Sequence, residues 1–338
     1  MIPRNFVVSL ISEYDSFLGN LIKAFYLKKP DLLQGVERQI TYSDLVKYKS
    51  IEDAREFILE KEIESILRKS HTEHFDILEK KFSIDLRKGL EIWPSFVEIT
   101  ERRNLFVHCD GVVSSQYLKN CLANKCNVND VEIGEKLDAP IEYINNTFQI
   151  LNQLSIKLTH VLWRKILPEE RDVADAALIN LSFDLLLQER YDLVSDVLDL
   201  FVNTINKFHD ETTKRILVVN LALSYKLANK KEKCNRELSR YDWSAIGYDF
   251  KIAHAVLTEQ YEQAGQYMEK LAATADMGEI EFLEWPIFKE FRESEYFVPA
   301  FKRSFDKDPF ENRSIEVDEQ EDIPQLSCEN GNEKLSSL

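Results

Sequence analysis

The sequence predicts an all-α protein, and three observations lead to this fold class. Glycine and proline, which interrupt helices, number only 9 each among 338 residues. Apolar residues recur at three- and four-residue steps over long stretches, which is the spacing of one helix face. Hydrophobic residues make up 44% of the chain and charged residues 30%, a balance typical of globular proteins. We therefore expect amphipathic helices that bury their apolar faces against one another.

Two long helices are expected in the first third of the chain. The first covers residues 5–27, where one face is apolar and where Pro30 follows the last turn. A second helix begins after Ser50, which together with Asp53 resembles a capping box. Its apolar pattern continues for about 30 residues, and charged residues fill the other faces as in a helical bundle.

A third and a fourth helix complete a bundle in residues 1–126. The third extends from Pro94 to Cys109, because proline fits the first turn and because Asp110-Gly111 can end the helix with a left-handed residue. The fourth is shorter and covers Ser114–Cys121. Four helices with short or moderate links are typical of an α-bundle.

Residues 141–305 are expected to form a second domain of repeated helices, after a break in the helical pattern at 127–140. Tyr191, Lys231 and Tyr261 hold equivalent positions in turns between paired helices, at separations of 40 and 30 residues. These separations are close to the ~34-residue period of tetratricopeptide repeats. The domain is therefore predicted to be TPR-like and to present a surface for a protein partner.

Acidic residues dominate the last segment of the chain, residues 306–338. Between Asp306 and Asp322 there are eight acidic residues and two basic ones, and large apolar residues are few. Such a composition does not form a core, so a disordered acidic tail is predicted. The whole chain carries a net charge of −16, whereas proteins that bind nucleic acid usually have a basic footprint. Binding of RNA therefore requires a local basic cleft within an acidic protein.

The sequence also excludes or disfavours several classes of protein. No apolar run approaches the ~18 residues of a membrane span, and the N-terminus lacks the apolar segment of a signal peptide. We therefore expect a cytoplasmic protein without membrane contact. Five cysteines at irregular spacing argue against a disulfide framework and against a zinc site. No glycine-rich phosphate loop is present, and no cofactor is expected.

The end of the third predicted helix carries the strongest functional signal. Arg103 and His108 lie there with four residues between them. Arginine is a permanent cation whose donors suit phosphate, and histidine both accepts and donates a proton near neutral pH. Together with Asn104 and the following Asp110-Gly111, they resemble the Arg-x4–6-His signature of the HEPN family. The resemblance implies a HEPN-like helical bundle over residues 1–126 and, in nuclease members, cleavage of RNA without a metal.

Helical geometry places the motif residues on different faces. At ~100° per residue, Glu101, Asn104 and His108 share one face. By the same measure Arg103 lies about 140° from His108, so the two side chains of one helix do not converge on one atom. Two copies of the helix packed across a two-fold axis can bring them together. We therefore expect a homodimer through the motif helices, which agrees with the dimers that the HEPN resemblance implies.

The resemblance assigns a role to each residue of the motif. Arg103 is expected to bind the scissile phosphate, His108 to move a proton of the 2′-hydroxyl reaction, and Asn104 to orient one of them. The expected products are a 2′,3′-cyclic phosphate and a 5′-hydroxyl. Three neighbours are expected to support the site: Glu101, Arg102 and Asp110.

His71 and His74 form a weaker candidate site. They lie three residues apart on the second predicted helix, a spacing that places two imidazoles on one face. The sequence indicates no third ligand, and a metal site needs at least three. We therefore interpret them as a solvated pair and expect no metal.

Two functions of different classes remain open. The first is a metal-independent endoribonuclease of the HEPN type, a toxin-like enzyme that acts in bacterial stress response or phage defence. The second is a non-catalytic helical adaptor that dimerises through its HEPN-like domain and recruits protein partners through its repeats. The run from Arg103 to His108 favours the enzyme, whereas the net charge of −16 and the repeated helices favour the adaptor.

Overall fold

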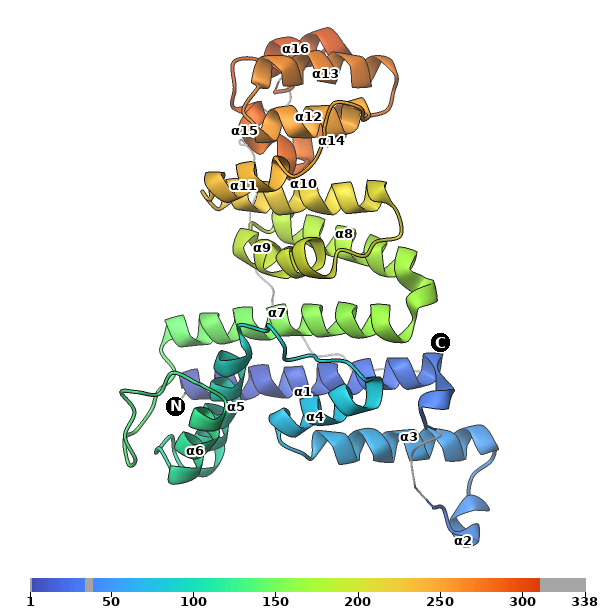
Figure 1. The fold of residues 1–338 in the computed structure, drawn as a ribbon, viewed down its shortest axis with the longest axis vertical. Helices are drawn as coiled ribbons and strands as arrows, with labels where there is room; N and C mark the ends of the chain where they lie inside the picture. The colour runs from blue at the N-terminus through green and yellow to red at the C-terminus, as the bar shows by residue number, and fades with distance from the viewer. Residues whose placement is uncertain (1, 34–38, 311–338) are drawn as a thin grey trace, which may run out of the picture. The chain divides into compact units, whose positions relative to one another are not determined.

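The computed structural model describes residues 2–33 and 39–310, and helices account for nearly all of the regular structure there (Figure 1). The described residues contain no strand, only an isolated bridge between Val112 and Lys136. The predicted all-α class is thus confirmed. The predicted disordered tail covers residues 306–338, of which 311–338 lie outside the described residues. Residues 306–310 are described, and Asp308 there pairs with Lys302 at 2.7 Å. In the described parts of the chain, every helix is too short or too polar to cross a bilayer.

The chain divides into two compact units, Met1–Tyr241 and Asp242–Leu338. Residues 127–140, where the sequence suggests a boundary, lie inside the first unit. The helices of the first unit are α1 (Ile2–Lys28), α2 (Tyr42–Leu45), α3 (Ile51–Leu67), α4 (His71–Phe82), α5 (Trp93–His108), α6 (Ser115–Ala123), α7 (Ile141–Ile166), α8 (Arg171–Leu187), α9 (Tyr191–Asp199), α10 (Glu211–Leu227) and α11 (Lys231–Leu238). Short 3₁₀ turns precede α2 and α8, and a π-helical segment, Leu200–Ile205, follows α9.

Helix α1 lies at the centre of the N-terminal bundle. Figure 1 shows it running alongside α7, with α3 on its other side, and it also packs against α5. Its buried residues recur at three- and four-residue steps, as the sequence predicts. Apolar residues of α7 belong to the same core, so this helix is part of the bundle. The core residues that α1 contributes include Val7, Ile11, Tyr14, Leu18 and Ile22.

The region after Ser50 differs from the prediction, because two helices form there instead of one of about 30 residues. Ser50 caps α3 as predicted, by accepting a hydrogen bond from the Asp53 backbone N–H at 3.0 Å. Ser70 then begins α4 with a capping box of its own: its backbone N–H donates to the Glu73 carboxylate at 2.9 Å. The apolar pattern continues through this break, which is why periodicity alone did not locate it.

Helix α5 ends as predicted, in a loop with two left-handed residues. Asp110 and Gly111 have φ values of +49° and +81°. The Gly111 N–H donates to the Leu105 carbonyl at 2.9 Å, and the Gly111 carbonyl accepts from the Leu137 N–H at 2.9 Å. The Arg4 guanidinium of α1 donates to the Asp110 carbonyl at 2.9 Å. The end of α5 is therefore fixed both to α1 and to the loop that precedes α7.

Three helix pairs share one kind of turn: α8–α9 and α10–α11 in the first unit, and α12 (Tyr248–Leu257) with α13 (Tyr261–Ala273) in the second. Each turn has a left-handed residue, at Glu189, Asn229 and Glu259, with φ between +58° and +61°. In each, the next residue donates its N–H to a carbonyl five residues earlier, at 2.8–2.9 Å. These are the turns that the sequence identifies as equivalent.

The second unit closes around an aromatic core. After α12 and α13, its helices are α14 (Glu279–Glu284), α15 (Lys289–Arg292) and α16 (Phe297–Phe305), with a 3₁₀ turn at Pro286–Phe288. Phenylalanine supplies much of the buried surface, and pairs of rings pack with edge-to-face or tilted geometry. The buried phenylalanines are Phe282, Phe288, Phe291, Phe297 and Phe301.

The loop after α5 leads to a first prediction. A Cβ atom at Gly111 would lie 2.8 Å from the Leu137 carbonyl oxygen, in a conformation that L-residues rarely adopt. We expect Gly111→Ala to lower the free energy of unfolding by about 2–4 kcal/mol. Gly134→Ala is the matched control, because Gly134 also has a positive φ, +88°, but nothing lies within 4 Å of its Cβ position. Urea unfolding followed by circular dichroism measures both, and equal losses would contradict the account.

Candidate functional site

The side chain of Arg102 points into the bundle and contributes to an internal network. Glu98, one turn earlier on α5, accepts a hydrogen bond from Arg102 Nε at 2.6 Å. The same carboxylate accepts from the hydroxyls of Tyr117 on α6, at 2.7 Å, and Tyr143 on α7, at 2.8 Å. The Arg102 guanidinium also stacks over the Tyr143 ring at 4.2 Å. Burial, and next the Glu98 carboxylate, raise the pKa values of both tyrosines. Arg102 therefore joins α5 to α7.

Arg103 leaves α5 in another direction, toward α1. Its Nη2 donates to Asp15 Oδ2 at 3.4 Å, and its Nη1 donates to Asn104 Oδ1 at 3.0 Å. The Arg103 side chain is 23% exposed, so part of the guanidinium remains open to solvent. The structure thus brings together two of the predicted site residues, Arg103 and Asn104, and adds a carboxylate that the sequence did not indicate.

His108 lies at the exposed C-terminal end of α5, away from this cluster. No hydrogen bond or ion pair joins it to Arg103 within the described chain. Its neighbours Val107 and Cys109 are also exposed, and Cys109 is a free thiol. Within one chain, the two residues to which the motif would assign phosphate binding and proton transfer therefore remain separate.

The predicted supporting residues Asp110 and Glu101 differ in their surroundings. The Asp110 carboxylate binds Lys136 at 2.6 Å and Arg4 at 3.2 Å, and the Lys136 hydrogen bond lowers its pKa. These bonds stabilise the loop that follows α5, in which Asp110 comes directly after Cys109. Glu101 is half-buried on α5.

His71 and His74 are buried, so their interpretation as a solvated pair is wrong. Their side chains meet the α1–α5 junction, where His71 Nε2 lies 2.9 Å from Asp15 Oδ1. His74 is 1% exposed, and neither of its ring nitrogens has a hydrogen-bond partner. Burial, and next the neighbouring His71, lower the pKa of His74. No local pattern links Asp15 to these histidines, because it lies 56 residues before His71 and shares no motif with it.

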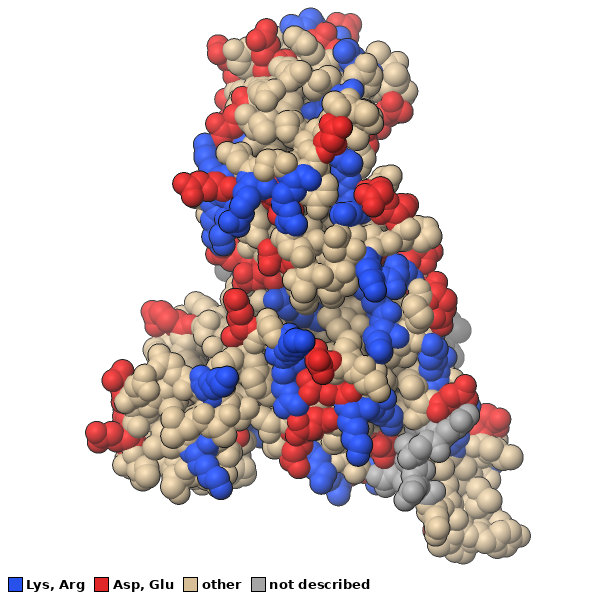
Figure 2. Space-filling model, in the orientation of Figure 1, with Lys and Arg blue, Asp and Glu red and all other residues tan. Residues whose placement is uncertain are grey.

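The first unit contains a basic cavity of about 430 Å³. It lies between the segment 84–90, the second half of α7 and the region from α8 to the π-helical segment. Asp85 is its only acidic lining residue, and no carboxylate of the described chain pairs with Lys88, Lys165 or Lys207. Arg164 differs, because it is buried and bound to Asp175 at 2.6 Å. Figure 2 shows Lys and Arg side chains gathered over the region of α7 and α8. The basic lining residues are Lys88, Lys157, Arg164, Lys165, Arg171 and Lys207.

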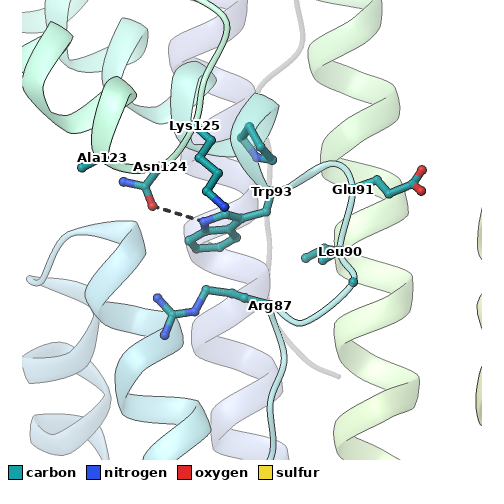
Figure 3. A pocket seen from close by; sticks show the side chains of 9 residues that line it. Arg87, Leu90, Glu91, Trp93, Ala123, Asn124 and Lys125 are labelled. Carbon is teal, nitrogen blue, oxygen red and sulfur yellow. Dashed lines mark hydrogen bonds between the residues drawn. The ribbon is translucent and has the colours of Figure 1, made fainter.

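A second cavity, of about 400 Å³, lies at the start of α5. Figure 3 shows Trp93 at its centre, with its Nε1 donating to Asn124 Oδ1 at 3.2 Å and with Arg87 and Lys125 on either side. The Arg87 guanidinium lies 5.4 Å from the centre of the Trp93 ring. Trp93 begins α5 and His108 ends it, which corresponds to about 22 Å of helical rise. This cavity is therefore separate from the predicted motif.

Comparison with known proteins adds no further constraint. No family model matches the chain, and no curated protein or solved structure matches it either. We therefore infer the function from the residues of α5, from their contacts with α1 and α4, and from the basic cavity.

The Glu98 network leads to a second prediction. Replacing Glu98 by Gln removes the negative charge that Arg102 requires and places an amide donor against another donor. Since the group is buried, we expect the free energy of unfolding to fall by about 2–4 kcal/mol. Glu101→Gln, on the same helix and half-buried, should change it by less than about 0.5 kcal/mol. Thermal and urea unfolding of both variants measure the difference, and a neutral Glu98→Gln would refute the proposed role of the network.

Proposed function

We propose that the protein is a metal-independent endoribonuclease of the HEPN type, which acts as a homodimer. One observation carries the proposal: α5 presents His108 at its exposed end, while Asp15 and Asn104 hold Arg103 on another side of the same helix. Metal-free RNA cleavage needs a phosphate-binding cation and a proton-transferring group, and α5 carries both, as Arg103 and His108. They lie on different sides of the helix, so we propose that each site combines Arg103 of one copy with His108 of the other. The resemblance of residues 98–118 to HEPN proteins supports the same assignment.

The chemistry follows from the nature of RNA, which carries its own nucleophile. His108 of one copy removes the proton of the 2′-hydroxyl, whose oxygen then attacks the adjacent phosphorus. The bond from phosphorus to the 5′-oxygen breaks, and the same His108, now in its cationic form, gives that oxygen a proton. Arg103 binds the phosphate and stabilises the charge that develops on its oxygens. The products are a 2′,3′-cyclic phosphate and a 5′-hydroxyl.

Dimerisation through the end of α5 is supported by apolar side chains around His108. Val107 is 48% exposed, and Val112, in the loop after the helix, is 37% exposed. Isolated exposed apolar residues are common, but here they flank the residue that needs a partner. We propose that they pack against the same residues of a second copy across a two-fold axis.

The net negative charge of the chain disfavours RNA binding, but the basic cavity offers a local surface of positive charge. Its exposed lysines lack acidic partners, so they concentrate positive potential locally although the chain carries −16. We propose that this cavity holds the backbone of the RNA at a distance from the scissile phosphate. Phosphate contacts of this kind position a strand without reading its sequence.

The repeated helix pairs support a second part of the proposal, a surface that binds another protein. Three pairs with the same left-handed turn suit a TPR-like array, which would bind a protein partner or a regulator. The same pairs favour the alternative function, a cytoplasmic adaptor without catalysis. An enzyme of stress response or phage defence should be toxic when expressed in bacteria, and His108→Ala should relieve the toxicity. An adaptor should give the same growth with either form.

Mixing two inactive variants tests the composite site. Arg103→Ala and His108→Ala should each lower the rate of RNA cleavage by about 10²–10⁴-fold. After subunit exchange, half of the dimers are mixed and each mixed dimer has one intact site, so activity should return to about a quarter of the wild-type rate. Cleavage of a labelled RNA in EDTA measures the recovery. Without recovery, the motif residues would have to act within one chain or not at all.

Charge reversal tests the basic cavity. We expect the triple variant Lys88→Glu, Lys165→Glu, Lys207→Glu to bind single-stranded RNA at least about 10-fold more weakly, and with a smaller salt dependence, because each lost phosphate contact lowers the slope by about 0.7. Fluorescence anisotropy in the His108→Ala background measures binding without cleavage.

The matched control for that experiment has the same net charge. It carries Lys47→Glu, Lys61→Glu and Lys230→Glu, at exposed lysines that pair with acidic residues elsewhere in the first unit. Surface ion pairs contribute little to stability, so this variant should remain folded. Equal RNA affinity of the two triple variants would show that the cavity is not the binding surface.

A further inference from the structure

Three buried polar groups without partners gather where α1, α4 and α5 meet. They are the Tyr14 hydroxyl, both ring nitrogens of His74 and Nε of Arg103. Buried polar atoms in folded proteins are nearly always hydrogen-bonded, to protein atoms, to water or to a bound ion. A cluster of unsatisfied groups at one junction therefore indicates that something else occupies it. His74 is 1% exposed, and neither ring nitrogen has a partner of good hydrogen-bond geometry, although the backbone of Leu67 and Lys69 lies near enough to act on its pKa.

The same junction contains a set of metal ligands. Asp15, His71 and His74 each offer one ligand atom, and these atoms all lie within 4.8 Å of one another. In a tetrahedral zinc site with bonds of about 2.1 Å, ligand atoms lie roughly 3.4 Å apart. Binding would have to bring the more distant of these atoms closer together, and His71 Nε2 is already 2.9 Å from Asp15 Oδ1.

We propose that Asp15, His71 and His74 bind a divalent transition-metal ion, and that zinc suits them best. Two imidazoles and one carboxylate are a common ligand set for zinc, whereas magnesium and calcium prefer oxygen ligands alone. Water would complete the coordination. The metal would join Asp15 of α1 to the first turn of α4, which begins 56 residues later at His71.

The surroundings of the site fix its ligands. Arg103 donates to Asp15 Oδ2 and so leaves the other carboxylate oxygen toward the histidines. Phe96 packs edge-on against the His71 ring, with ring centres 5.9 Å apart, and restricts its rotation. Partners of this kind orient the ligands of metal sites. The positive charge of Arg103 opposes a cation, so we expect Arg103→Gln to bind zinc more tightly than the wild type.

Metal analysis of the full chain tests the proposal. The wild type, incubated with ZnCl2 and then dialysed, should retain one zinc ion per chain by mass spectrometry of the metal. His71→Gln and His74→Ala should lose it, whereas His209→Ala, at an exposed histidine, should not. Added ZnCl2 should raise the Tm of the wild type and of His209→Ala only, since an ion that binds the folded state stabilises it.

A second measurement does not depend on the folding of variants. The wild type titrated with Co2+ should develop the visible absorption of a tetrahedral site, and ZnCl2 should remove it. A wild type that retains no zinc and shows no such spectrum would overturn the proposal and assign the junction to ordered water. Zinc retained equally by wild type and His74→Ala would overturn it too, because the ion would then lie elsewhere.

The proposed site shares the contact between Arg103 and Asp15 with the proposed nuclease, but the two proposals fail by different results. A protein that binds zinc at this junction but leaves RNA intact would refute the proposed function alone. A protein that cleaves RNA without retaining zinc would refute the metal site alone. Because EDTA can remove such an ion, circular dichroism in the EDTA buffer shows whether the protein used in the cleavage assay is folded.

Discussion

The buried carboxylate of Glu98 fixes the rotation of α5, and the placement of every motif residue depends on it. It accepts hydrogen bonds from side chains of α5, α6 and α7, all between 2.6 and 2.8 Å. A helix held in this way has no freedom to turn about its axis. Arg102 consequently faces the interior, Arg103 reaches α1, and His108 remains at the exposed end. We propose the dimer for this reason, since no hydrogen bond or ion pair of the described residues joins Arg103 to His108 within one chain.

Local signals in the sequence were sufficient for much of the fold. Capping by Ser50 and the left-handed Gly111 each depend on a few neighbouring residues, and both lie where the sequence predicts them. The three equivalent turns between helix pairs are also local. The break at Ser70 was missed although its capping box is local, because the apolar pattern continues through it. The packing of α7 in the N-terminal core depends on the whole chain, and no short segment indicates it.

In the candidate site, too, contacts between neighbouring residues are predictable from the sequence, whereas contacts between distant residues are not. Arg103 and Asn104 are adjacent in sequence, so their proximity is predictable. The carboxylate that binds Arg103 comes from Asp15, 88 residues away, and the same carboxylate contacts His71, which is buried together with His74 instead of solvated. The basic cavity likewise combines lysines from three distant segments. Net charge averages over the chain and does not show where like charges meet.

The central claim is that α5 carries the groups that cleave RNA by attack of its own 2′-hydroxyl. End-group analysis tests it most directly: purified protein is incubated with total RNA in EDTA, with His108→Ala as the matched variant. We expect fragments with 2′,3′-cyclic phosphate and 5′-hydroxyl ends from the wild type and intact RNA from the variant. Fragments with 5′-phosphate ends, or equal cleavage by both proteins, would contradict it.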